Sequence, residues 1–363
     1  MSVHELGYGL IGCGRISGPH IDAIAQTEGA RIVAVADPNP QKAEAARAAI
    51  GGEVAVHADW QELVADATVE AVVVCAPTQM HAEMSVAAMA AGRHVYCEKA
   101  MAASMGGCRA MIGARDRAGV KLTVGQSTRF RAPFAMARRL VERGEVGEVV
   151  AVDATFGGPA NPPEMGATDS WRYRAESAGN GHIINFGCHY IDTARFLCDD
   201  DPVAVSAIVA NRFSPGMIQE DQFVVTSTCD GGALITVALY CTPASTMPGD
   251  EGYVVIGTEG AVSALWRPDR VVLRRGGEGA DPVAIDDDLR EGPFVRLHRQ
   301  LRRAIEDDGP VPVAGEDAMR NVEWGLAAYL SSERRCQIEL PLSADLDGYV
   351  GPQLARTIPP TRD

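Results

Sequence analysis

An apolar stretch near the start of the chain, Tyr8–Ile11, runs directly into Gly12 and Gly14, and this junction limits the possible folds more than any other feature. Glycines after a strand allow a tight turn and let the backbone approach a pyrophosphate, whose charge then lies at the N-terminus of the next helix. A second apolar stretch ends in an acid, Asp37, which can accept hydrogen bonds from a ribose. The order predicts a dinucleotide-binding unit. Because Ser17 occupies the third glycine position, an ordinary strand-to-helix turn is the alternative.

The residue type at Asp37 also predicts which dinucleotide is bound. A carboxylate accepts hydrogen bonds from the free ribose hydroxyls of NAD and repels the 2′-phosphate of NADP. The next residues, Pro38, Asn39 and Pro40, supply no cation for that phosphate, so the sequence favours NAD. Asp37 could instead, or in addition, be the N-cap of a helix over Pro40–Ala49.

Composition limits the classes of partner and the cellular setting. The 363 residues exceed one ordinary core and predict two domains, while a net charge of −15 argues against nucleic acid and anionic membranes as partners. Met1–Gly9 lacks the basic and apolar segments of a signal peptide, so we expect a cytoplasmic protein. The nine cysteines are dispersed without a CxxC pair, which predicts no disulfide framework, no metal site and no catalytic thiol, Cys13 included.

The spacing of apolar residues changes near residue 126 and predicts an α/β protein with two kinds of sheet. Short apolar strands alternate with Ala-rich helices before this point, as in a parallel, doubly wound Rossmann domain. Longer alternating strands separated by turn signals follow, as in a large, open, mainly antiparallel sheet. We therefore expect a dinucleotide-binding domain over 1–126, a second domain over 127–342, and a tail over 343–363. Helices are expected at Pro293–Glu306 and Glu316–Ser332.

Several motifs together resemble the Gfo/Idh/MocA family of sugar and polyol oxidoreductases across nearly the whole chain. The matching segments are Gly12–Ser17 with His20, Ala36–Pro38, Cys75–His81, Gly92–Lys99, Arg129–Phe130, Gly181–Asp192 and Gly315–Leu342. The resemblance implies hydride exchange between a sugar carbon and the nicotinamide of NAD. It also implies that the domain over 127–342 is a substrate-binding and oligomerisation domain. It implies that the cofactor is bound by Gly12, Cys13, Gly14, Arg15, Ile16, Asp37, Ala76, Pro77, Thr78, His81, Glu98, Lys99 and Gln126.

The family's catalytic lysine falls on Lys99, and its Asp-x-x-x-His pair falls on Asn185 and His189. Histidine has a pKa suited to a general base, and a lysine cation can stabilise the alkoxide that forms as the hydroxyl loses its proton. An amide cannot titrate, so Asn185 can only hydrogen-bond the substrate or fix the imidazole. A second departure from the family is Ala100, which stands where a proline, commonly in a cis peptide, usually follows the lysine.

A helix predicted over Ile183–Leu197 would present Asn185, His189 and Asp192 on one face. Asp192 could orient His189, cap a neighbouring element or contact substrate. Substrate contacts are predicted for Lys99, Arg129, Trp171, Arg172, Asn185 and His189. The alternative for each arginine is an ion pair at the surface.

These residues predict an NAD-dependent dehydrogenase that oxidises a secondary hydroxyl of a sugar, cyclitol or glycoside. One alternative uses the same hydride step transiently in a lyase, epimerase or glycosidase that regenerates NAD. The other is a non-catalytic ligand sensor on the same fold. An open sheet needs one face covered, so a homodimer or homotetramer is expected.

Overall fold

The computed structural model describes residues 5–159, 181–211, 220–242, 251–276 and 279–351. The chain divides into two compact units. The first contains Met1–Ser127 and Gly292–Arg320, and the second contains Thr128–Glu291 and Asn321–Asp363. None of the described helices is long and apolar enough to cross a membrane.

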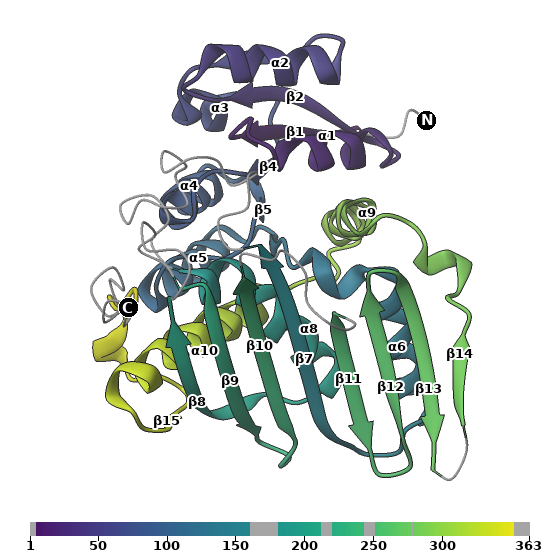
Figure 1. Cartoon of the computed structure of the whole chain (residues 1–363). Coiled ribbons are helices and arrows are strands. Elements are labelled where there is room, and N and C mark those ends of the chain that lie inside the picture. Colours follow the sequence, from purple (N-terminus) through teal and green to yellow (C-terminus); the bar gives the residue numbers. More distant parts are fainter. Residues whose placement is uncertain (1–4, 160–180, 212–219, 243–250, 277–278, 352–363) are drawn as a thin grey trace. The chain divides into compact units, whose positions relative to one another are not determined.

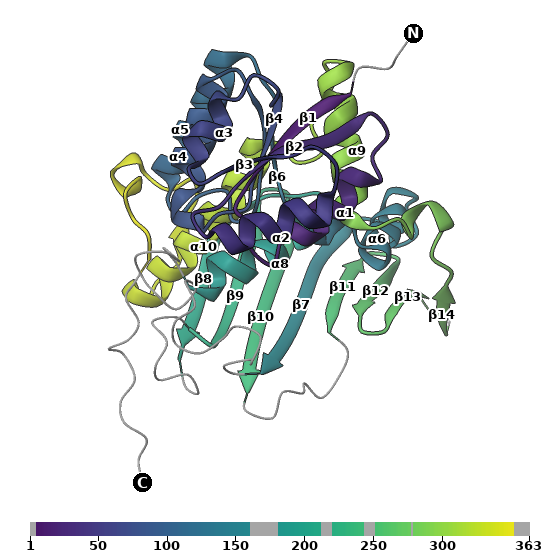
Figure 2. The ribbon, with the colours of Figure 1, turned by 90° about the horizontal axis from the view of Figure 1, so that it is seen from above.

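The first unit is a six-stranded parallel sheet with the order β3-β2-β1-β4-β5-β6. Its strands are β1 (Leu6–Ile11), β2 (Ala30–Ala36), β3 (Ala55–His57), β4 (Ala71–Val74), β5 (His94–Cys97) and β6 (Leu122–Val124). Its helices are α1 (Ser17–Ala25), α2 (Pro40–Ile50), α3 (Trp60–Ala65), α4 (Thr78–Ala90), α5 (Met105–Ala118) and α9 (Pro293–Glu306). Figure 2 shows α3, α4 and α5 on one face of this sheet and α1 and α9 on the other. The predicted doubly wound Rossmann fold is confirmed, and the sheet is buried on both faces because helices cover each side.

One part of the first unit comes from late in the chain. Arg302 of α9 donates from Nε to the carbonyl of Gly29 at 3.0 Å, and the Thr123 hydroxyl donates to the carbonyl of Val313 at 2.9 Å. The sequence prediction assigned residues 292–320 to the second domain, whereas the structure groups them with the first unit. An amphipathic pattern predicts the helix itself, but it does not predict the sheet on which that helix packs.

The second unit contains a nine-stranded sheet with the order β14-β13-β12-β11-β7-β10-β9-β8-β15. Its strands are β7 (Val149–Pro159), β8 (Pro202–Ala210), β9 (Gln222–Cys229), β10 (Leu234–Thr242), β11 (Gly252–Gly257), β12 (Gly260–Trp266), β13 (Asp269–Arg275), β14 (Ala280–Val283) and β15 (Ile338–Glu339). All neighbouring strands are antiparallel except β7 and β10, which pair in parallel. The predicted open, mainly antiparallel sheet is confirmed.

Helices of the second unit cover one face of this sheet. They are α6 (Ala132–Glu142), a π-helical segment (Ile183–Gly187) that continues into α8 (Cys188–Cys198), and the later part of α10 (Gly315–Arg334) (Figure 1). Short 3₁₀ segments lie at Ser127–Phe130, Asp287–Leu289 and Ala344–Leu346. Along β9 the side chains of Phe223 and Val225 are buried while Thr226 is exposed, so apolar and polar positions alternate. No described helix covers the opposite face of the sheet. The strand register places Ile208 and Leu234 on this face, where they are 74% and 54% exposed.

Candidate active site

The glycine loop after β1 has the geometry of a dinucleotide-binding turn. Gly12 has a φ of +90°, and a Cβ there would lie 2.8 Å from the carbonyl oxygen of Cys75, so a larger residue would be excluded. At Gly14 a Cβ would meet no atom within 4 Å, which leaves room for a ligand to approach the backbone. The loop therefore fits the pyrophosphate of a dinucleotide at the start of α1.

Asp37 is held against this loop at the end of β2. Its Oδ2 accepts a hydrogen bond from the backbone N–H of Cys13 at 2.8 Å, and its Oδ1 accepts one from Asn39 at 2.8 Å. The suggestion that Asp37 is the N-cap of the following helix is wrong. Asn39 is that cap, because its side chain accepts from the backbone N–H groups of Gln41 and Lys42. The two bonds hold the Asp37 carboxylate beside the glycine loop.

Cys13 lies in the loop as a buried thiol. Burial, followed by the nearby Asp37 carboxylate, raises its pKa to about 12, so it stays protonated at neutral pH and cannot act as a nucleophile. The residues that the structure describes include no group of three or more His, Cys, Asp or Glu side chains arranged to bind a metal ion.

The end of β5 carries Glu98 and Lys99, and Glu98 is anchored through both carboxylate oxygens. Oε1 lies 3.1 Å from Nε2 of His20, and Oε2 accepts the backbone N–H of Lys99 at 3.2 Å. Nδ1 of His20 lies 2.8 Å from Nε2 of His298. Glu98 is 6% exposed, and both imidazoles are fully buried. The sequence pointed to His20 as part of a motif but gave no sign of His298, because that residue comes from α9.

His20 bridges Glu98 and His298 through its two ring nitrogens. Burial and the neighbouring His20 lower the pKa of His298 well below its usual value, so it stays neutral. The array ties α1 and α9 to the strand end that presents Lys99.

His81, expected near the cofactor, connects two loops at this edge of the sheet. Its ring nitrogens lie 2.7 Å from the carbonyl oxygen of Ala100 and 2.8 Å from that of Ala76, and burial lowers its pKa. The Lys99–Ala100 peptide is cis although Ala100 replaces the family's usual proline. Thr78, at the start of α4, and Gln126, after β6, are buried in the same unit, 2% and 1% exposed.

Asn185 and His189 lie on consecutive helical segments of the second unit. The predicted helix is present, but its first turn is π-helical, and Asn185 lies on that turn while His189 lies on α8. The backbone N–H and the side-chain Nδ2 of Asn185 both donate to the carbonyl of Gly181, at 3.0 Å and 3.2 Å. Asn185 is 5% exposed, and His189 is more accessible.

Asp192, one turn further along α8, forms a buried ion pair. Its Oδ2 accepts from Nε of Arg129 at 2.7 Å, its Oδ1 accepts from Nη2 of Arg129, and Asn321 donates to Oδ1 at 2.8 Å. Asp192 is fully buried, and Arg129 is 9% exposed. A surface ion pair was the alternative to the substrate contact predicted for Arg129; the structure shows an ion pair, and it is buried. Trp171 and Arg172 lie outside the described residues.

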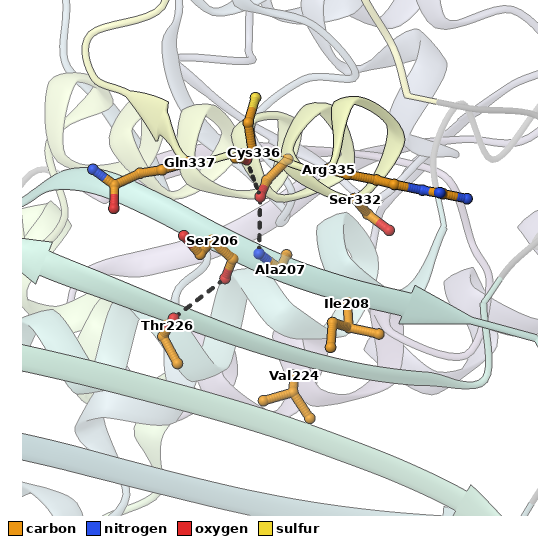
Figure 3. A pocket seen from close by; sticks show the side chains of 10 residues that line it. Ser206, Ala207, Ile208, Val224, Thr226, Ser332, Arg335, Cys336 and Gln337 are labelled. Carbon is orange, nitrogen blue, oxygen red and sulfur yellow. Dashed lines mark hydrogen bonds between the residues drawn. The ribbon is translucent and has the colours of Figure 1, made fainter.

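A pocket of about 690 Å³ lies elsewhere, between the end of α10 and strands β8 and β9 (Figure 3). It contains none of the predicted site residues. Beyond the short partner β15, the hydroxyls of Ser331 and Ser332 accept hydrogen bonds from the backbone N–H groups of Ala207 and Val209 at 3.0 and 3.2 Å. These contacts satisfy two backbone N–H groups at the edge of β8.

Comparison with known proteins identifies the family. Residues 6–126 match the oxidoreductase family with an NAD-binding Rossmann fold, and residues 134–263 match the GFO/IDH/MocA C-terminal domain. The chain belongs to the GFO/IDH/MocA oxidoreductase family. It is accordingly an NAD-binding oxidoreductase, as the glycine loop and Asp37 indicate.

Relatives match almost end to end. A 1,5-anhydro-D-fructose reductase of Ensifer adhaerens is 30% identical over 88% of this chain and 94% of its own length. An inositol 2-dehydrogenase of Rhizobium meliloti (strain 1021) is 29% identical over 92% of this chain and 98% of its own. The WlbA dehydrogenase from Bordetella pertussis, solved with NADH and UDP-GlcNAcA, is 26% identical with a TM-score of 0.82, covering 94% of this chain and 100% of that one. A levoglucosan dehydrogenase solved with NADH shares the fold, with a TM-score of 0.86 at 22% identity over 94% of this chain and 100% of that one.

Proposed function

We propose that this protein is an NAD-dependent dehydrogenase that oxidises a secondary hydroxyl of a sugar, cyclitol or glycoside. The observation that carries the proposal is the anchoring of Glu98 directly before Lys99, at the carboxyl edge of a doubly wound sheet, where such sheets bind ligands. Relatives whose names specify inositol and an anhydro sugar support a carbohydrate substrate.

Each proposed catalytic residue has a distinct role. NAD, when bound, supplies the acceptor for the hydride. His189 takes the proton of the reacting hydroxyl, and the Lys99 ammonium stabilises the negative charge that develops on its oxygen. Asn185 orients the substrate or the imidazole, because its amide exchanges no proton.

The remaining residues are assigned by the same proposal. The first unit holds the cofactor with the loop residues Gly12, Cys13, Gly14, Arg15 and Ile16, with Asp37, and with Ala76, Pro77, Thr78, His81, Glu98, Lys99 and Gln126. The second unit contributes Arg129, Trp171, Arg172, Asn185 and His189 to substrate binding. Asp192 already balances the charge of Arg129 and holds its guanidinium in place. Arg129 would therefore contact the substrate as a hydrogen-bond donor.

The decisive experiment incubates the protein with NAD and a panel of polyols, aldoses, uronic acids and glycosides, and follows NADH absorbance and product mass. Formation of NADH without bond cleavage supports the dehydrogenase. Cleavage or epimerisation without net NADH supports the transient-redox alternative, and NAD binding with no reaction supports a sensor.

Variants then test the residue roles. We expect His189→Ala and Lys99→Ala to lower kcat by about 10²- to 10⁴-fold while NAD binding stays nearly intact, because removal of a general acid or base typically costs this much. Asn185→Ala should mainly raise KM. If His189→Ala kept nearly full turnover, His189 would not be the base, and Lys99 would become the leading candidate for that role.

We also propose that two or four copies associate through the face of the nine-stranded sheet that no described helix covers. The exposed Ile208 and Leu234 on this face are apolar, and an isologous dimer would bury both copies of each. All nine cysteines are free thiols, which suits the reducing cytoplasm. A monomeric mass by light scattering at micromolar concentration would contradict the association, and Ile208→Glu should weaken it.

A further inference from the structure

Glu220 is a fully buried carboxylate at the start of the helix that carries Asn185 and His189. Its Oε1 accepts hydrogen bonds from the backbone N–H of Ile183 at 2.5 Å and from the hydroxyl of Tyr329 on α10 at 2.8 Å. Ile183 opens the π-helical segment, so its N–H is one of the groups that a helix cannot satisfy internally. Glu220 supplies the missing acceptor.

The second carboxylate oxygen of Glu220 lies against the backbone of Gly181. A Cβ at Gly181 would lie 1.9 Å from Oε2 and 2.6 Å from the Tyr329 hydroxyl, so only glycine fits. Oε2 is buried and has no hydrogen-bond partner among the described residues. The carbonyl of the same Gly181 accepts two hydrogen bonds from Asn185, one from its backbone N–H and one from its side chain. Glu220 therefore holds the backbone at Gly181 in place, and this backbone in turn holds Asn185.

We propose that Glu220 is a positioning residue, whose ionised carboxylate holds the first turn of the Asn185–His189 helix in its reactive geometry and whose protonation loosens that turn. The inference rests on the proposed function and adds a second titrating group to it. A carboxylate makes stronger hydrogen bonds to the Ile183 N–H than a neutral acid does, and its charge interacts favourably with the positive end of the helix.

Burial is the main reason why Glu220 titrates near neutrality. Burial raises the pKa of Glu220 to about 7. Hydrogen bonds from the backbone N–H groups of Ile183 and of Glu220 itself, and from the Tyr329 hydroxyl, lower this pKa, and the Asp221 charge raises it. The titratable and charged groups around it are Tyr329 on α10 with Tyr349 behind it, His182 next to Ile183, the adjacent Asp221, and Cys241 on β10. Glu220 and a catalytic histidine would thus both contribute an acidic limb to the same pH profile.

Kinetics of Glu220→Gln separate the two contributions. Glutamine keeps an oxygen acceptor for Ile183 and Tyr329 but cannot ionise, so the variant mimics the protonated state at every pH. A small displacement of a reacting group can cost about 10²-fold in rate, and we expect kcat to fall about 10-fold at pH 8.5 and less than about 2-fold at pH 6. Tyr329→Phe removes a hydrogen bond that favours the ionised form and should move the limb to higher pH.

A matched control is available at the surface of α10, the helix that carries Tyr329. The exposed Glu333 of α10 accepts a hydrogen bond from the hydroxyl of Tyr349 at 2.7 Å, which repeats the carboxylate and phenol pair away from Gly181. We expect Glu333→Gln to leave kcat unchanged at both pH values. The proposal would be overturned if Glu220→Gln kept full activity, or if it lost the same fraction of activity at pH 6 and at pH 8.5.

A second readout does not depend on turnover. Hydrogen exchange of segment 181–187, measured by mass spectrometry and corrected for the intrinsic effect of pH, should be faster in Glu220→Gln than in the unmodified protein at pH 8.5 and equal at pH 6. Equal exchange at both pH values would refute the role of Glu220. If exchange behaves as expected but no carbohydrate reacts in the panel above, the proposed function fails while the positioning of this turn by Glu220 stands.

Discussion

Replacing Asp192 by asparagine should cost the protein a large part of its stability. The side chain of Asp192 is fully buried, and it accepts two hydrogen bonds from Arg129 and one from Asn321. Asp192→Asn keeps the volume but leaves the Arg129 guanidinium, whose side chain is 10% exposed, without its counter-charge. Removing one partner of a buried ion pair typically costs about 3 to 5 kcal/mol, and we expect a loss in this range.

Urea unfolding followed by tryptophan fluorescence measures the loss, since Trp266 and Trp324 both lie in the second unit. The matched control is Asp288→Asn, which breaks the exposed pair of Asp288 with Arg139, whose side chains are 64% and 31% exposed. Exposed pairs contribute about 1 kcal/mol or less. If the two variants lost similar free energies of unfolding, the reasoning from burial would be wrong. Arg129→Met combined with Asp192→Asn should recover part of the loss, because no unpaired cation remains.

Three further outcomes follow from the structure. In fluorescence titrations, Asp37→Ala should bind NADH about 10-fold more weakly than the unmodified protein, because it lacks one charge-assisted hydrogen bond. The ratio of the dissociation constants for NADPH and NADH should also become smaller. If the unmodified protein bound NADPH more tightly than NADH, the role of Asp37 would be refuted. His298→Leu should cost about 1 to 3 kcal/mol in thermal unfolding because His20 loses a buried partner, whereas Tyr8→Phe, which removes a buried hydroxyl with no partner among the described residues, should be nearly neutral. The pKa of Glu220 is about 7 in the folded protein and 4.5 ordinarily, so ionisation of this group destabilises the fold. As pH rises from about 4.5 through 7, the free energy of unfolding of the unmodified protein should fall by about 3 kcal/mol relative to that of Glu220→Gln. Chemical denaturation that shows the same pH dependence for both proteins would contradict this.

The fold was predictable because its signals are local. The glycines after β1, the acid at the end of β2 and the change from short apolar strands to longer alternating ones each depend on neighbours in sequence. The same holds for the helix over Pro293–Glu306, whose bounds agree with the prediction. Its place in the first unit was not predictable, since packing partners far apart in sequence leave no periodic signal.

The site divides in the same way. Lys99, His189 and Asp37 stand in recognisable local motifs, so their residue types suggested roles directly. Glu220 and His298 carry no motif, and their importance comes from burial against Gly181 and His20, which only tertiary structure reveals. Asp192 shows that local spacing does not identify a partner. Its position three residues after His189 suggested roles that included orienting the imidazole, whereas in the structure its carboxylate binds Arg129 and Asn321.

The return of residues 292–320 to the first unit has a consequence for how the protein is made. Ribosomes release the chain from its N-terminus, so the parallel sheet emerges long before α9, and His20 must wait for His298 until more than four fifths of the 363 residues have been synthesised. A fragment ending at Ser127 would expose the surface of α1 that α9 covers. The cofactor-binding unit is therefore completed only after residues 292–320 have been synthesised, although its six strands all lie within the first 127 residues.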